Sequence, residues 1–122
     1  MKKILVVDDS ETLRNQIKGV LEKSGYSVVE GEDGLTGLAR LKENSDVSLI
    51  LCDVNMPNMN GLSMIEEVHK LPDYNKIPIF MLTTEANSEI KKKAKESGVI
   101  AWIVKPFVEA TMLAAIKKVL GV

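Results

Sequence analysis

The chain of 122 residues has little of several things, and each shortage excludes a class of protein. It has a single cysteine, Cys52, so an intramolecular disulfide framework is excluded. Aromatic residues make up only 4% of the chain, so aliphatic side chains and methionine must build the core. The formal net charge is -1, which gives no general electrostatic reason to bind nucleic acid or a membrane surface.

Long hydrophobic runs are also missing. No apolar stretch approaches the roughly 20 residues that a helix needs to span a bilayer. The Met-Lys-Lys start is typical of a signal peptide, but the apolar run at residues 4–7 is too short for one, and Asp8 and Asp9 end it. We therefore expect a cytoplasmic protein that binds neither membrane nor nucleic acid.

What the chain does have is a regular alternation of short apolar runs and amphipathic stretches, without a low-complexity tract or a linker. Short, β-branched runs predict buried strands, and apolar residues at helical spacing predict helices. The predicted strands are residues 4–7, 27–30, 48–52, 78–82 and 100–104. The predicted helices are residues 11–23, 33–44, 62–71, 85–97 and 108–120. This order predicts one α/β domain over residues 1–122, with a parallel sheet covered by helices on both faces.

Polar residues follow four of the five predicted strands. They are Asp8 and Asp9 after the first strand, Asp53 after the third, Thr83 and Thr84 after the fourth, and Lys105 after the fifth. In such a sheet, ligands bind outside the carboxyl ends of the strands. Because parallel strands all end at one edge, we expect these residues to share one pocket.

The residue types in this pocket indicate a particular chemistry. Three carboxylates at about 4 Å repel one another by roughly 1–4 kcal/mol per pair, so a stable site needs a cation. A small, acidic, all-oxygen site suits Mg²⁺. Lys105 adds a fixed positive charge and Thr83 a hydroxyl donor. Nucleophilic carboxylate, metal, lysine and hydroxyl are the groups that phosphoryl transfer onto an aspartate requires.

At these positions the chain resembles the response-regulator receiver domains, and the resemblance runs along its whole length. It is carried by Asp8-Asp9, the run of residues 53–61, Thr83, and Lys105-Pro106-Phe107. The resemblance implies a flavodoxin-like (βα)5 fold with a five-stranded parallel sheet of order 2-1-3-4-5. It also implies a cis peptide bond before Pro106, and no enzymatic activity beyond the domain's own phosphorylation and dephosphorylation.

The resemblance assigns roles to the site residues. Asp53 is the expected phosphoacceptor, and a sensor histidine kinase is the expected donor. The expected Mg²⁺ ligands are Asp9 directly, Asp8 largely through water, Asp53, and the backbone carbonyl of Asn55. Lys105 is expected to pair with Asp53 and then with the phosphoryl group.

The resemblance also implies a switch. The phosphoryl group draws Thr83 inward, and an aromatic side chain on the fifth strand swings into the space that opens. That aromatic is Trp102, where the enteric chemotaxis regulators carry tyrosine. The face formed by the fourth helix, the fifth strand and the last helix then changes shape, and a partner protein reads it. The alternative for Trp102 is a static packing residue.

Within the family, the chain is most similar to the stand-alone chemotaxis regulators. Asn55 and Glu85 match those regulators at two positions that tune dephosphorylation, whereas Thr84 replaces a small alanine and is expected to slow it. The expected partners of a monomeric protein are a CheA-like histidine kinase, a flagellar switch protein and a phosphatase. The chain stops just past the last predicted helix, so we expect output through protein–protein contact.

Other interpretations stay open. The chain fits a phosphorelay intermediate or a phosphate sink, and it also fits a receiver cut from a multidomain transcription regulator. A true enzyme of the flavodoxin-like class would need a substrate pocket, and no residues indicate one. The basic run Lys91-Lys92-Lys93 with Lys95 predicts a solvated helix face, or alternatively a docking patch for an acidic partner.

Overall fold

Five strands and five helices alternate along the chain in the computed structural model, which describes residues 2–54, 56, 58–74, 76–84 and 88–121. The strands are β1 (Lys3–Val7), β2 (Ser27–Gly31), β3 (Val47–Asp53), β4 (Ile79–Thr83) and β5 (Val99–Val104). The helices are α1 (Glu11–Lys23), α2 (Gly34–Glu43), α3 (Gly61–His69), α4 (Ser88–Glu96) and α5 (Glu109–Leu120). All strand pairs are parallel and the sheet order is β2-β1-β3-β4-β5, which confirms the predicted fold class and strand order.

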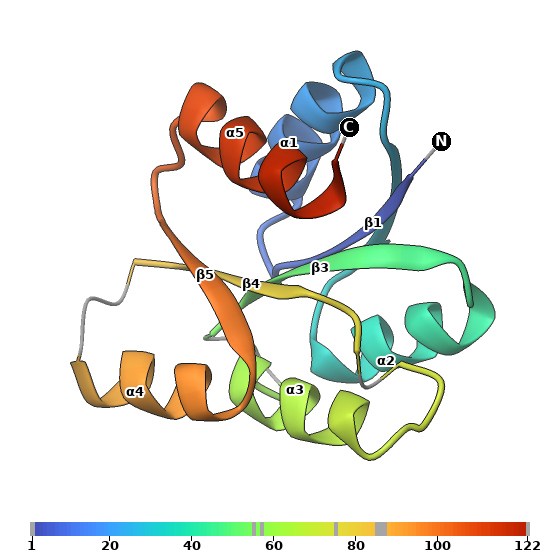
Figure 1. Ribbon diagram of the computed structural model, residues 1–122, viewed down its shortest axis with the longest axis vertical. Coiled ribbons are helices and arrows are strands. Elements are labelled where there is room, and N and C mark those ends of the chain that lie inside the picture. The colour runs from blue at the N-terminus through green and yellow to red at the C-terminus, as the bar shows by residue number, and fades with distance from the viewer. Residues whose placement is uncertain (1, 55, 57, 75, 85–87, 122) are drawn as a thin grey trace.

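Helices cover both faces of the sheet (Figure 1). Helices α1 and α5 lie on one face, where Ile17 of α1 and Met112 of α5 join a buried cluster with alternate strand residues. Helices α2, α3 and α4 lie on the other face, where Leu41, Met64 and Ala94 belong to a second buried cluster. A sheet buried on both sides explains why its central strands are continuous apolar runs.

The ends of several strands and helices differ from the predicted boundaries, and the observed ends place two functional side chains on strands. Strand β3 runs through Asp53 and strand β4 through Thr83, so both side chains belong to the last residue of a strand. Asp33 and Val108 are N-caps and not the first helical residues, and α3 ends at His69, two residues before the predicted end. The predicted helix start at residues 85–87 lies outside the described residues.

A glycine lets α3 approach the end of β3. A Cβ atom on Gly61 would overlap the carbonyl oxygen of Asp53. The Gly61 N–H also donates a hydrogen bond of 2.9 Å to the carbonyl oxygen of Val54. The start of α3 is thus held directly against the carboxyl end of β3, which only a residue without a side chain permits.

Two further expectations concern single features. The peptide bond between Lys105 and Pro106 is cis, as the family resemblance implied. Within the described ranges, the chain has no helix that is both long enough and apolar enough to cross a membrane.

Candidate functional site

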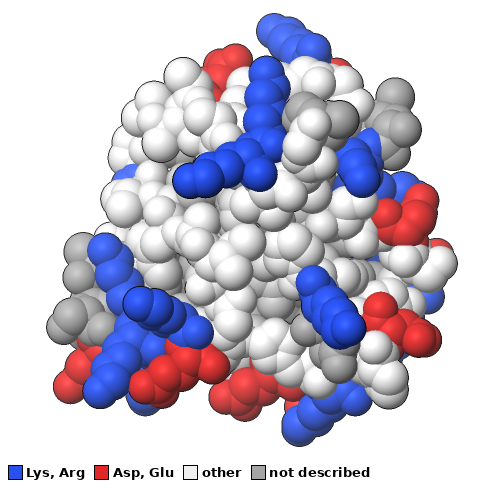
Figure 2. All heavy atoms as spheres, in the orientation of Figure 1, with Lys and Arg blue, Asp and Glu red and all other residues white. Residues whose placement is uncertain are grey.

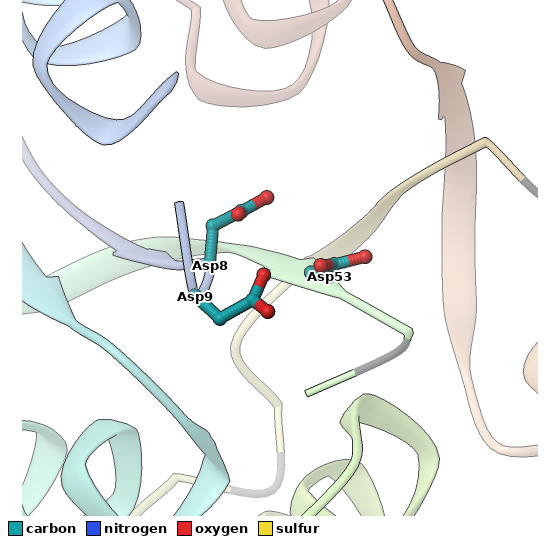
Figure 3. A group of neighbouring side chains, drawn as sticks. All are labelled: Asp8, Asp9 and Asp53. Carbon is teal, nitrogen blue, oxygen red and sulfur yellow. The ribbon is translucent and has the colours of Figure 1, made fainter. Parts of the chain in front are cut away.

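Three carboxylates meet at the carboxyl edge of the sheet. Asp8 and Asp9 follow β1, and Asp53 ends the neighbouring strand β3, whose Cys52 pairs in register with Val7. One carboxylate oxygen from each of the three lies within 4.8 Å of the others. Figure 3 shows the three side chains projecting from the two strand ends into a common space. Asp8 is 0% exposed and Asp53 5%, whereas Asp9 is open to solvent, so two of the three carboxylates have lost most of their contact with water.

Lys105 supplies the positive charge that faces these carboxylates. Its Nζ lies 2.6 Å from Oδ2 of Asp8 and 3.2 Å from Oδ2 of Asp53. Burial alone would lower the pKa of Lys105, but the two carboxylates outweigh it and hold the pKa above its ordinary value. Lys105 therefore stays charged. The sequence interpretation paired it with Asp53 alone, and the structure adds Asp8 as a second and closer partner.

The second oxygen of Asp8 is also engaged. Its Oδ1 accepts a hydrogen bond of 2.8 Å from the backbone N–H of Ser10, which in turn caps α1 by accepting from the N–H of Leu13. The guanidinium of Arg14 donates to the Asp8 carbonyl oxygen at 2.6 Å. Asp8 is thus fixed by its neighbours, and the exposed Asp9 has the freer carboxylate.

Thr83, the last residue of β4, and the next residue, Thr84, differ in their exposure to solvent. Thr83 is 1% exposed, and its carbonyl oxygen accepts a 2.8 Å hydrogen bond from the backbone N–H of Lys105, which locks the ends of β4 and β5 together. Thr84 is exposed. Thr83 is therefore held inside the sheet at the end of β4, whereas Thr84 lies at the surface.

Trp102 lies half-buried on β5, on the face of the sheet that α4 covers. The ammonium of Lys91, on α4, lies 5.7 Å from the centre of the indole ring, a cation–π distance. The indole N–H is buried and has no hydrogen-bond partner among the residues that the structure describes. A buried donor without an acceptor is costly, so hydrogen bonding does not stabilise the indole in this position.

The donor set fits a hard divalent cation. Carboxylate oxygens are the ligands that Mg²⁺ prefers, and an open side lets the ion keep several waters. Here the exposed Asp9 provides that open side. The predicted backbone ligand at Asn55 and the predicted rate-tuning residue Glu85 lie outside the described residues.

Sequence reasoning missed a contact between the loop that follows β3 and the start of α2. The carboxylate of Asp33 is buried and accepts a hydrogen bond of 2.7 Å from the side-chain amide of Asn58. An acid before a helix indicates an N-cap, which Asp33 is. Its second contact joins residues 25 positions apart, and local sequence patterns carry no signal for such a pair.

Known proteins resemble this chain over nearly its whole length. Residues 4–117 match the family described as "Response regulator receiver domain". The chain is 40% identical over 120 residues to the chemotaxis protein CheY1 of Helicobacter pylori, covering 98% of this chain and 97% of that protein. It is also 40% identical to a CheY homolog of Campylobacter jejuni, over 98% of this chain and 92% of that one. The crystallized chemotaxis protein CheY4 of Vibrio cholerae superposes with a TM-score of 0.92 at 38% identity, covering 98% of both chains.

The ion-pair geometry predicts the effect of removing the lysine charge. Lys105→Met removes the cation that pairs with the buried carboxylates of Asp8 and Asp53, so the free energy of unfolding should fall by about 3–5 kcal/mol at pH 7 without divalent ions. Adding Asp8→Asn should recover most of that loss. Urea unfolding in the presence of a chelator measures both.

The control is Lys18→Met. Lys18 pairs with Glu30 at 3.7 Å on the surface, where its loss should cost less than about 0.5 kcal/mol. Equal losses in the two lysine variants would contradict the importance of the buried pair.

Proposed function

Because this chain belongs to the response regulator receiver domain family, we propose that it is a two-component signalling switch that is phosphorylated on Asp53. Receiver domains are regulators and not classical enzymes, so its only catalysis would be its own phosphorylation and dephosphorylation. The observation that carries the proposal is the convergence of three carboxylates and one lysine from three separate strand ends.

The metal site follows from the accessibility of each carboxylate. Asp9 is exposed and would bind Mg²⁺ directly, together with Asp53. Asp8 is already engaged at both oxygens by Lys105 and Ser10, so it would act largely through a water ligand. The backbone carbonyl of Asn55 is the remaining proposed ligand. Bound Mg²⁺ would neutralise negative charge on the transferred phosphoryl group.

The chain's own residues would then carry the transfer. A carboxylate oxygen of Asp53 attacks the phosphorus of a phosphohistidine, an acyl phosphate forms, and the phosphorus–nitrogen bond breaks as the imidazole leaves. Lys105 lies close enough to Asp53 to move from that carboxylate to the new phosphoryl oxygens. The buried Thr83 hydroxyl would bond the phosphoryl group from the neighbouring strand. The exposed Thr84 would screen the acyl phosphate from water and slow its hydrolysis.

The face formed by α4, β5 and α5 would report the change. The backbone bond between Thr83 and Lys105 connects the site to β5, which also carries Trp102. Movement of Trp102 would break its contact with Lys91 and reshape a hollow of about 420 Å³ between β5 and α5. Figure 2 shows basic side chains at α4, with acidic ones next to them, beside a largely uncharged area over β5. The basic side chains and the uncharged area suit a partner with acidic and apolar groups.

The partners are proposed from the relatives, which are named as chemotaxis proteins. A CheA-like histidine kinase would be the donor, a flagellar switch protein the target, and a phosphatase would reset a monomeric cytoplasmic switch. We also propose that residues 1–122 form a single receiver domain. The second candidate is a phosphorelay or phosphate-sink receiver, which the same site geometry would serve.

Phosphorylation is tested by changing the acceptor. Asp53→Asn should abolish incorporation of phosphate from a phosphorylated kinase or a small acyl phosphate, because the amide is a poor nucleophile. Intact mass spectrometry with and without Mg²⁺ measures incorporation. The matched control is Asp46→Asn, an exposed aspartate that pairs with Lys3 on the surface, which should label normally. Normal labelling of Asp53→Asn would refute the site assignment.

Target binding separates chemotaxis from the second candidate. A peptide from a flagellar switch protein should bind about tenfold more tightly when beryllofluoride occupies the phosphoryl site, because the ligand favours the state that the face adopts on activation. Fluorescence anisotropy of the labelled peptide measures the affinity. Equal affinity in both states would rule out the motor target and favour a relay or sink.

A further inference from the structure

The loop between β3 and α3 is tied to the rest of the domain at its end and at its tip. At its end, the Gly61 N–H bonds the Val54 carbonyl at 2.9 Å. At its tip, the Met59 carbonyl accepts a bond of 3.1 Å from the N–H of Gly34, the first residue of α2. The side-chain amide of Asn58 donates a bond of 2.7 Å to Oδ2 of Asp33. This loop leaves β3 directly after Asp53, one of the proposed metal ligands, and α3 begins after it at Gly61, which lies against the Asp53 carbonyl oxygen.

Asp33 does more than cap a helix. Its Oδ1 accepts the Thr36 N–H at 2.8 Å, which completes the N-cap of α2. Its Oδ2 takes no part in the cap and accepts the hydrogen bond from the side-chain amide of Asn58. The hydrogen bonds from the Thr36 N–H and the Asn58 side chain hold the pKa of this carboxyl below its ordinary value, so Asp33 is charged at neutral pH. Hydrogen bonds to a charged acceptor are roughly twice as strong as neutral ones.

The loop side of the contact is specialised as well. Asn58 has φ of 66°, in the left-handed region that asparagine, aspartate and glycine adopt most readily. A Cβ atom on Gly34 would come within 2.6 Å of the Met59 side chain and 2.7 Å of its carbonyl oxygen, so loop and helix touch directly. A glycine (Gly34), a residue in the left-handed region (Asn58) and a buried carboxylate (Asp33) therefore meet at this contact.

The other side-chain N-caps of the described helices lack this second contact. Ser10 and Asn60 each accept one helix N–H, from Leu13 and Ser63 respectively. Among the residues that the structure describes, neither the Ser10 hydroxyl nor the Asn60 side-chain amide has a hydrogen-bond partner far along the chain. Both residues are exposed, whereas Asp33 is 5% exposed. Capping α2 alone would not require the Asn58 contact.

We propose that Asp33 and Asn58 form a positioning clamp that holds the β3–α3 loop in the shape that binds Mg²⁺ beside Asp53. The inference rests on the proposed metal site. Fixing the loop before the ion arrives removes part of the ordering entropy that binding would otherwise cost. Groups that orient a metal site from outside it typically change metal affinity by about 10–100-fold when they are removed.

The test is a reciprocal exchange of the two side chains. Asn58→Asp sets two carboxylates against each other and should weaken Mg²⁺ binding about tenfold. The double variant Asp33→Asn with Asn58→Asp restores one amide donor and one carboxylate acceptor, and its asparagine still caps α2, so affinity should return to within about twofold of the native value. Calorimetric Mg²⁺ titration measures both.

The direction of the change in Mg²⁺ affinity distinguishes a loss of positioning from an effect of charge alone. A carboxylate added near a cation site strengthens binding when it acts by its charge alone. A weaker Asn58→Asp variant therefore reports loss of the clamp. Unchanged or tighter Mg²⁺ binding in this variant would overturn the proposal.

A stability control separates positioning from general loosening of the fold. Asn44→Ala acts at the other end of α2, where it removes hydrogen bonds to Lys3 and to the Arg40 carbonyl. It should lower the free energy of unfolding by about 1 kcal/mol without altering Mg²⁺ affinity. An equal loss of Mg²⁺ affinity in Asn44→Ala would also overturn the clamp.

A metal-free readout distinguishes failure of the clamp from failure of the metal site. Amide hydrogen exchange at Gly34 and Gly61 should speed up in Asn58→Asp and return to the native rate in the exchanged double variant. If the native protein bound no Mg²⁺, the metal site itself would be refuted, and unchanged exchange rates would refute the clamp separately.

Discussion

Two buried carboxylates share one ammonium group at the carboxyl edge of this sheet, and a third carboxylate lies beside them. Because charges removed from water interact strongly, the repulsion between these buried carboxylates is costly unless positive charge lies close to them. Lys105 offsets part of the cost, and the two carboxylates outweigh burial and raise its pKa above the ordinary value, which favours its charged form. The remaining negative charge is what gives the site its proposed affinity for a divalent cation and, through that cation, for a phosphoryl group.

The parallel sheet is what brings this charge together. Asp8, Asp53 and Lys105 come from the ends of three different strands, and these ends meet at one edge because the three strands run parallel. The two helical layers then serve different purposes around that edge. The layer of α2, α3 and α4 carries the loop contact at Asp33 and the aromatic contact of Trp102, so the proposed clamp and the proposed movement of Trp102 lie on the same face.

Much of this arrangement could be predicted from the sequence. Short apolar runs ending in Asp8 and Asp53 predicted strands whose ends carry chemistry, and the alternation with amphipathic helices predicted the parallel sheet. Strand order came from family resemblance, because periodicity alone does not say which strands are neighbours. The Lys105–Asp8 contact and the Asp33–Asn58 bond were not predicted, since both depend on side-chain geometry between segments far apart in the chain.

Boundaries were harder to predict for a physical reason. Asp53 and Thr83 are polar residues that continue their strands, because the backbone pairing with the neighbouring strand extends to them. Their polarity marked the end of the apolar run and not the end of the strand. The distinction matters here, since a side chain on a strand is held more rigidly than one on a loop.

The most direct test of the account is the fluorescence of Trp102, the only tryptophan in the chain, during addition of Mg²⁺ and then beryllofluoride. The account predicts a change with Mg²⁺ as the acidic site is filled, and a further step with beryllofluoride as Trp102 leaves its position beside Lys91. A spectrum that stays the same through both additions would contradict the proposed connection between the acidic site and the β5 face.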